Sequence, residues 1–183
     1  MRVRCPQGFR WLVVAIGVGL AAEASASADV PTGYRTIAAE YGVPPSVLYA
    51  IALTESGTRV DAKRSIRPWP WTLNVSGQGR FYATRKAAAD ALAFLLASGR
   101  ESVDIGLMQV NRRYHRKRLG TPQLALDPYH NLRVAAAILQ DCLRGRQDWW
   151  EAIGCYHAPN NPSRAARYRG RVFEHWQRVT RHG

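Results

Sequence analysis

Helix-starting and helix-ending residues divide most of the chain into short segments. Proline stands where a helix can begin at Pro44-Pro45, Asp127-Pro128 and Asn161-Pro162. A proline in the first turn of a helix loses no hydrogen bond, and glycine commonly follows the last helical residue. This pattern predicts a mainly helical protein. We expect helices over 33–41, 44–56 and 84–98, and further helices after Asp127, Asp148 and Asn161.

Residues 68–83 have a different pattern. Two runs rich in aromatic and β-branched residues flank the turn sequence Ser76-Gly77-Gln78-Gly79. Such runs around a glycine-containing turn predict a β-hairpin. Together with the helix that follows, the hairpin forms an insert over about 64–100. The expected fold class is therefore mainly α, an α+β arrangement with a small β-hairpin insert.

Residues 1–28 have the three parts of a secretory signal peptide. Three arginines precede an apolar run over 11–22, and small residues lead to Ala28. This order is typical of export signals. The run is shorter than the ~20 residues of a comfortable membrane span, although an uncleaved anchor is the alternative interpretation. We expect cleavage after Ala28, no stable membrane span afterwards, and one domain over 29–183.

The charge balance predicts an anionic partner. The 183 residues include 26 Lys and Arg against 13 Asp and Glu, a formal net charge of +13. Such a protein is attracted to nucleic acid, a membrane surface or an acidic polymer. Export argues against nucleic acid, which leaves a membrane surface or an acidic polymer outside the cytosol as the expected partner.

Cys142 and Cys155 are the cysteines that follow the export segment. Disulfides persist outside the cytosol, so we expect these two to pair, the alternative being two separate buried thiols. The histidines and cysteines lack the spacing of known metal-binding motifs, so we expect neither a metal nor another cofactor.

Glu55 is the first candidate catalytic residue. It follows Ile51 by four residues and Leu48 by seven, which places it on the apolar stripe of the predicted 44–56 helix. Burial and the negative end of a helix both disfavour a charged carboxylate, so they raise its pKa. A carboxyl group that stays protonated near neutral pH suits a general acid. The alternative is an ordinary glutamate that turns out to solvent at the helix end.

Residues 104–111 form the second candidate motif. Gly106 allows a tight turn or a close approach to a ligand, and Met108 can form an adaptable apolar wall. Gln109 and Asn111 carry amides that can bind sugar hydroxyls and N-acetyl groups.

The 104–111 motif has a second interpretation. Taken alone, it is typical of a helix start capped by Asp104, with Leu107 and Val110 in the core.

Residues 152–159 form the third motif, in which Tyr156 can hydrogen-bond a buried carboxyl group and orient it. The alternative for Tyr156 is a core tyrosine with a solvated hydroxyl.

In sequence order, the three motifs resemble the lysozyme-like catalytic domain of soluble lytic transglycosylases, a group that includes goose-type lysozymes. The resemblance rests on Glu55-Ser56, on Gly106-Leu107-Met108-Gln109 and on Ala152 to Tyr156, and it covers most of residues 33–180. Asp104-Ile105 and His157 look most like the specialised members that accompany conjugation, pilus and secretion machines. The insert is longer than in compact members, and Tyr156-His157-Ala158-Pro159 replaces the usual Tyr-Asn-Ala-Gly.

The resemblance implies a periplasmic enzyme that cleaves peptidoglycan glycan strands, leaves 1,6-anhydromuramic ends and opens the wall locally for an envelope-spanning machine. It implies that Glu55 is the catalytic acid and base. The residues that it implies in substrate binding or positioning are Ser56, Gly106, Leu107, Met108, Gln109, Asn111 and Tyr156. Two alternatives stay open: a lysozyme-type hydrolase, in which Asp104 is a second catalytic carboxylate, and a module that only binds cell wall.

Overall fold

The structure is a computed structural model that describes residues 30–59, 65–146 and 148–181. The predicted signal peptide over 1–28 lies outside these residues. The described residues form eight helices and six short strands. In chain order they are α1 (Thr32–Glu40), α2 (Pro45–Ser56), β1 (Gly57–Arg59), β2 (Ile66–Pro68), β3 (Thr72–Val75), β4 (Gln78–Phe81), α3 (Arg85–Ala97), β5 (Asp104–Ile105), β6 (Val110–Asn111), α4 (Arg112–Leu119), α5 (Pro122–Ala125), α6 (Pro128–Arg144), α7 (Trp149–His157) and α8 (Pro162–Arg181).

Helix α2 lies at the centre of the helical half of the protein. Its apolar residues are buried nearly all round, and Leu48 and Ile51 are fully buried. A helix that is apolar on most sides needs neighbours on most sides, and α1 and α8 both pack against it. Packing on several sides holds the C-terminal end of α2 in place.

Side-chain caps begin three of the predicted helices. Thr84 accepts the backbone N–H of Ala87 at the start of α3, and Asp127 accepts that of His130 at the start of α6. Asp148 does the same for α7. Such caps satisfy N–H groups that have no partner within the helix. The predicted helix starts are therefore confirmed.

The predicted hairpin in the insert is also confirmed. Strands β3 and β4 pair antiparallel through a turn at Ser76 and Gly77, both of which have positive φ. Positive φ at both turn residues suits the twist of a tight hairpin. The hairpin belongs to a four-stranded antiparallel sheet of order β4-β3-β5-β6. A second, two-stranded sheet of β1 and β2 was not predicted.

The prediction of a helix start at Asp104 is wrong. Residues 104–111 form a short hairpin in which Asp104 pairs with Asn111 and Ile105 with Val110. Strand β5 also pairs with β3, and the N–H of Gly106 donates to the Thr72 carbonyl at 2.8 Å. The backbone groups of this segment bond the insert and side chains of α2, α6 and α7, partners that a local helix-capping pattern does not reveal.

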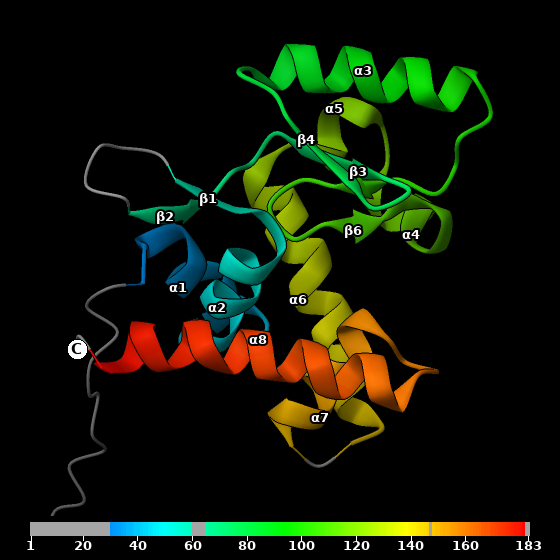
Figure 1. The fold of residues 1–183 in the computed structure, drawn as a ribbon. Helices are drawn as coiled ribbons and strands as arrows, with labels where there is room; N and C mark the ends of the chain where they lie inside the picture. Colours follow the sequence, from blue (N-terminus) through cyan, green and yellow to red (C-terminus); the bar gives the residue numbers. More distant parts are fainter. Residues whose placement is uncertain (1–29, 60–64, 147, 182–183) are drawn as a thin grey trace, which may run out of the picture.

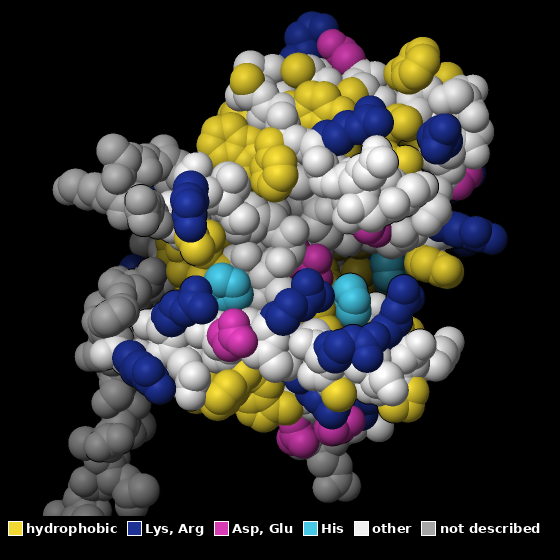
Figure 2. Space-filling view, in the orientation of Figure 1, with side chains coloured by type: hydrophobic (Ala, Val, Ile, Leu, Met, Phe, Trp, Pro, Cys, Tyr) yellow, Lys and Arg dark blue, Asp and Glu magenta, His cyan; other side chains and the backbone are white. Residues whose placement is uncertain are grey.

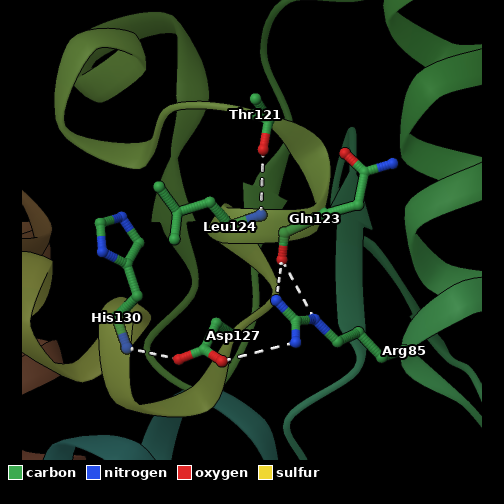
Figure 3. A network of polar contacts seen from close by, with 6 residues as sticks. All are labelled: Arg85, Thr121, Gln123, Leu124, Asp127 and His130. Atoms are coloured by element: carbon green, nitrogen blue, oxygen red, sulfur yellow. Dashed lines mark hydrogen bonds and ion pairs between the residues drawn. The ribbon is translucent and has the colours of Figure 1, made fainter.

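The sheet and α3 lie on one side of the molecule, and α1, α2, α7 and α8 lie on the other, with α6 running between them (Figure 1). A polar network anchors α3 at the α5–α6 corner (Figure 3). The guanidinium group of Arg85 donates to the Gln123 carbonyl at 2.6 and 3.1 Å and lies 3.5 Å from Asp127. The insert is therefore attached to the domain at both the sheet and this corner.

Cys142 and Cys155 form the expected disulfide, which joins α6 to α7 with a Cα–Cα distance of 5.8 Å. Helices α6 and α7 pack against each other, so the two cysteines face one another across that contact. None of the helices in the described part of the chain is both long and apolar enough for a membrane span.

Candidate active site

The packing of α2 against α8 places Glu55 beside Tyr168. Glu55 is the penultimate residue of α2, and its Oε1 accepts a hydrogen bond of 2.5 Å from the Tyr168 hydroxyl. Tyr168 is only 1% exposed. Tyr168 lies on the buried side of α8, and the sequence alone did not place it at Glu55. The only signal for its role was a hydroxyl on an apolar stripe, since a buried tyrosine usually needs a partner.

The surroundings of Glu55 keep its carboxyl group protonated up to neutral pH. Burial raises the pKa of Glu55 to about 7, because a charged carboxylate loses its hydration there. The hydrogen bond from Tyr168 lowers this pKa, the negative charge of Asp104 raises it, and the positive charge of Arg171 lowers it. The prediction of a raised Glu55 pKa therefore agrees with the structure.

Tyr156 lies close to the same site but has a different partner. Its hydroxyl donates to the carbonyl oxygen of Met108 at 2.7 Å. Burial raises the pKa of Tyr156 well above its usual value, and the charges of Glu55 and Asp104 raise it further. The hydrogen bond to Glu55 that we expected from Tyr156 comes from Tyr168 instead. Tyr156 holds the Met108 backbone beside the carboxyl group.

Asn131 on α6 holds the turn between β5 and β6. Its fully buried side chain accepts the N–H of Met108 at 2.9 Å and donates to the carbonyls of Ile105 and Ala125 at 3.0 and 3.1 Å. A buried amide needs such partners, because an unpaired polar group in the core costs free energy. Sequence analysis did not single out Asn131, although it lies on the same helical stripe as Ala135.

Gly106 is required by this turn. Its φ is +80°, and a Cβ atom built there would lie 2.7 Å from Nδ2 of Asn131. The predicted tight turn at Gly106 is therefore present, and the close neighbour within the protein is Asn131. Any larger residue would push this amide away from the Met108 backbone.

Ser56 and Gln109 connect the same turn to its surroundings. The Ser56 hydroxyl at the end of α2 donates to the Leu107 carbonyl at 2.7 Å. The Gln109 side chain donates to the Gly106 carbonyl at 2.8 Å, and Leu107 and Met108 are buried in the core. These residues thus position the turn beside Glu55.

Asp104 is the second carboxylate near Glu55. Its Oδ1 accepts a hydrogen bond of 2.7 Å from the Asn111 side chain, which also lies 3.3 Å from the Ser102 hydroxyl. Burial raises the pKa of Asp104, whereas the hydrogen bond from Asn111 lowers it. Asp104 is a strand residue rather than a helix cap, and Asn111 caps α4 by accepting the N–H of Arg113.

A histidine and an arginine cover the Tyr168 ring. The His157 ring stacks on it with centroids 4.2 Å apart and planes only 1° from parallel, and the Arg171 guanidinium lies 5.4 Å from its centroid. Figure 2 shows a hollow between the two halves of the molecule, with Lys, Arg and His side chains gathered on its α8 side. The site therefore has a basic rim around a partly buried acid.

Within the described ranges, no group of three or more His, Cys, Asp and Glu side chains is arranged to hold a metal ion. The candidate groups for chemistry are Glu55, Asp104 and Tyr168, and Glu55 is the one with both a raised pKa near 7 and a hydrogen bond that orients it.

A family model described as Transglycosylase SLT domain matches residues 34–177. The chain belongs to this family. The SLT match includes Glu55, the 104–111 hairpin, Tyr156 and Tyr168, and it also spans the insert. The resemblance inferred from the three motifs and the expected mainly helical lysozyme-like fold are both confirmed.

The curated relatives of this SLT-family chain come from Salmonella. "Invasion protein IagB" of Salmonella typhimurium and of Salmonella typhi is 36% identical to it over 86 residues. The alignment covers 43% of the SLT-family chain and 53% of the Salmonella protein, so it spans about half the length of these relatives. No solved structure matches the chain.

Proposed function

We propose that this protein is a periplasmic lytic transglycosylase of peptidoglycan. It cleaves the β-1,4 bond between N-acetylmuramic acid and N-acetylglucosamine and leaves a 1,6-anhydromuramic end. The observation that carries the proposal is the Glu55 carboxyl group, which has a pKa of about 7 and is held by Tyr168 beside the 104–111 hairpin. Membership of the SLT family supports the same reaction.

In the first step, protonated Glu55 donates its proton to the glycosidic oxygen as the bond from that oxygen to the anomeric carbon breaks. A general acid works best when its pKa lies near the working pH, and the raised pKa of Glu55 meets this condition. The N-acetyl group of the muramic residue can stabilise the positive charge that develops at the anomeric carbon. Tyr168 bonds Oε1, which leaves Oε2 of Glu55 to face the substrate.

In the second step, the muramic 6-hydroxyl attacks the anomeric carbon and Glu55, now ionised, accepts the hydroxyl proton. The 1,6-anhydro ring closes, Glu55 is protonated again, and no water is consumed. The nucleophile belongs to the substrate and therefore reacts at a high effective concentration. Arg171 near Glu55 helps to stabilise the carboxylate between the two steps, because its positive charge lowers the pKa of Glu55.

The turn beside Glu55 is the proposed sugar-binding wall. Ser56, Tyr156 and Asn131 each bond its backbone and hold its shape. We expect Gln109 and Asn111 to contact the sugars at this wall, whereas the Met108 side chain is fully buried in the core and supports the wall from behind. Gln109 has a positive φ, a backbone conformation that residues other than glycine rarely adopt.

A lysozyme-type hydrolase is the second candidate function, because Asp104 lies near enough to Glu55 to raise its pKa. Most glycoside hydrolases use two carboxyl groups at the glycosidic bond that they cleave. Digestion of purified peptidoglycan followed by mass spectrometry of the fragments separates the two reactions. Anhydromuramic ends support the transglycosylase, and reducing muramic ends with one added water overturn it.

The proposed cellular role is the local opening of the wall for an envelope-spanning machine such as a conjugation, pilus or secretion apparatus. The Salmonella relatives carry the name invasion protein, which supports a role of this kind. Cell fractionation tests the location, since recovery of the protein from the cytosol would contradict a periplasmic enzyme. A protein that binds peptidoglycan but releases no fragments would instead be a non-catalytic wall-binding module.

A further inference from the structure

A hollow of about 690 Å³ lies at the edge of the sheet where the insert meets α4. Its wall comes from the β3–β4 turn, from the segment between α3 and β5, and from the first turns of α4, which lie side by side in Figure 1. It therefore combines the two parts of the sequence that the proposed chemistry does not use, the insert and the basic run over 112–118.

Three arginines give this hollow an uncompensated positive charge. Arg100, Arg113 and Arg116 line it and are exposed, and no ion pair within the described ranges neutralises them. Glu101 is the acidic residue in the wall, and it is bound by the nearly buried Arg112 at 2.6 Å. The carboxylate that could balance the arginines is thus occupied by a fourth arginine that does not line the hollow.

The backbone of the hollow is well supported. The N–H of Arg100 donates to the Leu95 carbonyl at 3.0 Å, and that of Arg112 donates to the Val103 carbonyl at 2.9 Å. Asn111 accepts the N–H of Arg113 and so begins the helix that carries two of the arginines. The three guanidinium groups therefore project from fixed backbone positions, which reduces the entropy lost when they bind an anion.

The hollow adjoins the proposed catalytic site along the β5–β6 hairpin. Ser102 in its wall lies 3.3 Å from the Asn111 side chain, and that side chain donates a hydrogen bond to Asp104. The charge of Asp104 in turn raises the pKa of Glu55. Ser102 and Asp104 are two positions apart in the sequence, a span of at most about 7 Å. A substituent attached to a sugar near Glu55 can therefore reach the arginines.

We propose that this arginine hollow binds the carboxylates of the stem peptides that branch from the muramic residues, and so selects peptide-bearing glycan over bare glycan. The inference rests on the proposed function, because that function supplies the glycan strand. A guanidinium group binds a carboxylate through two parallel hydrogen bonds, and a stem peptide carries several carboxylates. Substrate selection then comes from the α4 arginines together with the insert residues that complete the hollow.

The test compares the double variant Arg113→Gln/Arg116→Gln with the control Arg80→Gln/Lys117→Gln. The control loses the same charge from exposed residues that do not line the hollow. Turnover is measured on peptide-bearing strands and on strands whose peptides have been removed with an amidase. We expect the hollow variant to lose at least about tenfold in kcat/KM on peptide-bearing strands, because each lost charge-assisted contact costs about that factor, with little change on bare strands. The control variant should keep the parent kcat/KM on both substrates. Equal losses on both substrates, or no loss, would overturn the inference.

A binding measurement separates this inference from the proposed function. Calorimetric titration with a soluble stem tetrapeptide should show binding to the parent protein and about tenfold weaker binding to the hollow variant. If the peptide binds in this way and no glycan is cleaved, the inference stands and the proposed function fails. If glycan is cleaved and inorganic phosphate competes with the peptide at equal concentration, the hollow is a general anion site and the assignment to peptide carboxylates is wrong.

Discussion

The Tyr168 hydroxyl donates a hydrogen bond of 2.5 Å to Oε1 of Glu55, across 113 residues of sequence. The bond joins the end of α2 to α8, and it leaves the second carboxyl oxygen of Glu55 unoccupied by Tyr168. It also opposes the effect of burial on the pKa of Glu55. The pH dependence of the proposed reaction should therefore change when the hydrogen bond between Tyr168 and Glu55 is removed.

Replacing Glu55 with glutamine should remove the general acid while keeping an acceptor for Tyr168. We expect turnover of peptidoglycan to fall by about 10²–10⁴-fold, the usual contribution of acid–base catalysis. Fragment release measured by chromatography checks this loss. Glu174→Gln, an exposed change on α8, is the matched control and should keep activity. Unchanged turnover in Glu55→Gln would remove Glu55 from the mechanism.

The Tyr168→Phe variant should shift the alkaline limb of the rate profile. Activity needs protonated Glu55 in the first step, so the parent should lose kcat/KM as the pH rises through about 7. Because the hydrogen bond lowers the pKa of Glu55, its removal should move this limb to higher pH. Poorer orientation should also reduce kcat by about tenfold. Tyr34→Phe removes another buried hydroxyl, on a ring that contacts Tyr49 and does not affect the pKa of Glu55, and it should leave the limb in place.

Arg171→Met should also move the alkaline limb to higher pH, because the positive charge of Arg171 lowers the pKa of Glu55. The shift should shrink as salt is added, since Arg171 is exposed and its field is screened. Rate profiles at low and high ionic strength measure this dependence. Arg167→Met on the same helix is the control, and an equal shift in both variants would assign the effect to net charge alone.

Gly106→Ala should lower the free energy of unfolding by about 2–3 kcal/mol, because it combines an unfavourable positive φ with a clash at Asn131. Gly77→Ala provides the comparison. Gly77 also has a positive φ, but a Cβ there would meet nothing within 4 Å, so a loss of about 1 kcal/mol is expected. Denaturant unfolding measures both values. Equal losses would mean that Asn131 gives way without cost.

Cys142→Ser/Cys155→Ser should lower the free energy of unfolding by about 3 kcal/mol, since the disulfide closes a loop with a sequence separation of 13. Unfolding of the parent protein in a reducing agent should show the same loss. A reduced parent as stable as the oxidised one would contradict a stabilising role for the disulfide.

Local features were predictable because short-range interactions decide them. The helices that begin at Thr84, Asp127 and Asp148 are set by side chains that bond the next turn of the backbone. The β3–β4 hairpin follows from a turn whose residues tolerate positive φ. The position of Glu55 on the apolar stripe followed from helical periodicity, and burial there accounts for its raised pKa.

The sequence by itself therefore determined six of the eight helices described above, the hairpin of the insert, the candidate acid and the pair of cysteines, whereas α4 and α5 were not predicted. Only the tertiary structure decided that residues 104–111 form strands, because their backbone partners lie in β3. It also decided that Tyr168 rather than Tyr156 bonds Glu55, and that Asn131 supports the turn. Each of these contacts joins residues more than twenty positions apart. The packing of whole elements selects such partners, and no local sequence pattern encodes which of two suitable tyrosines bonds Glu55.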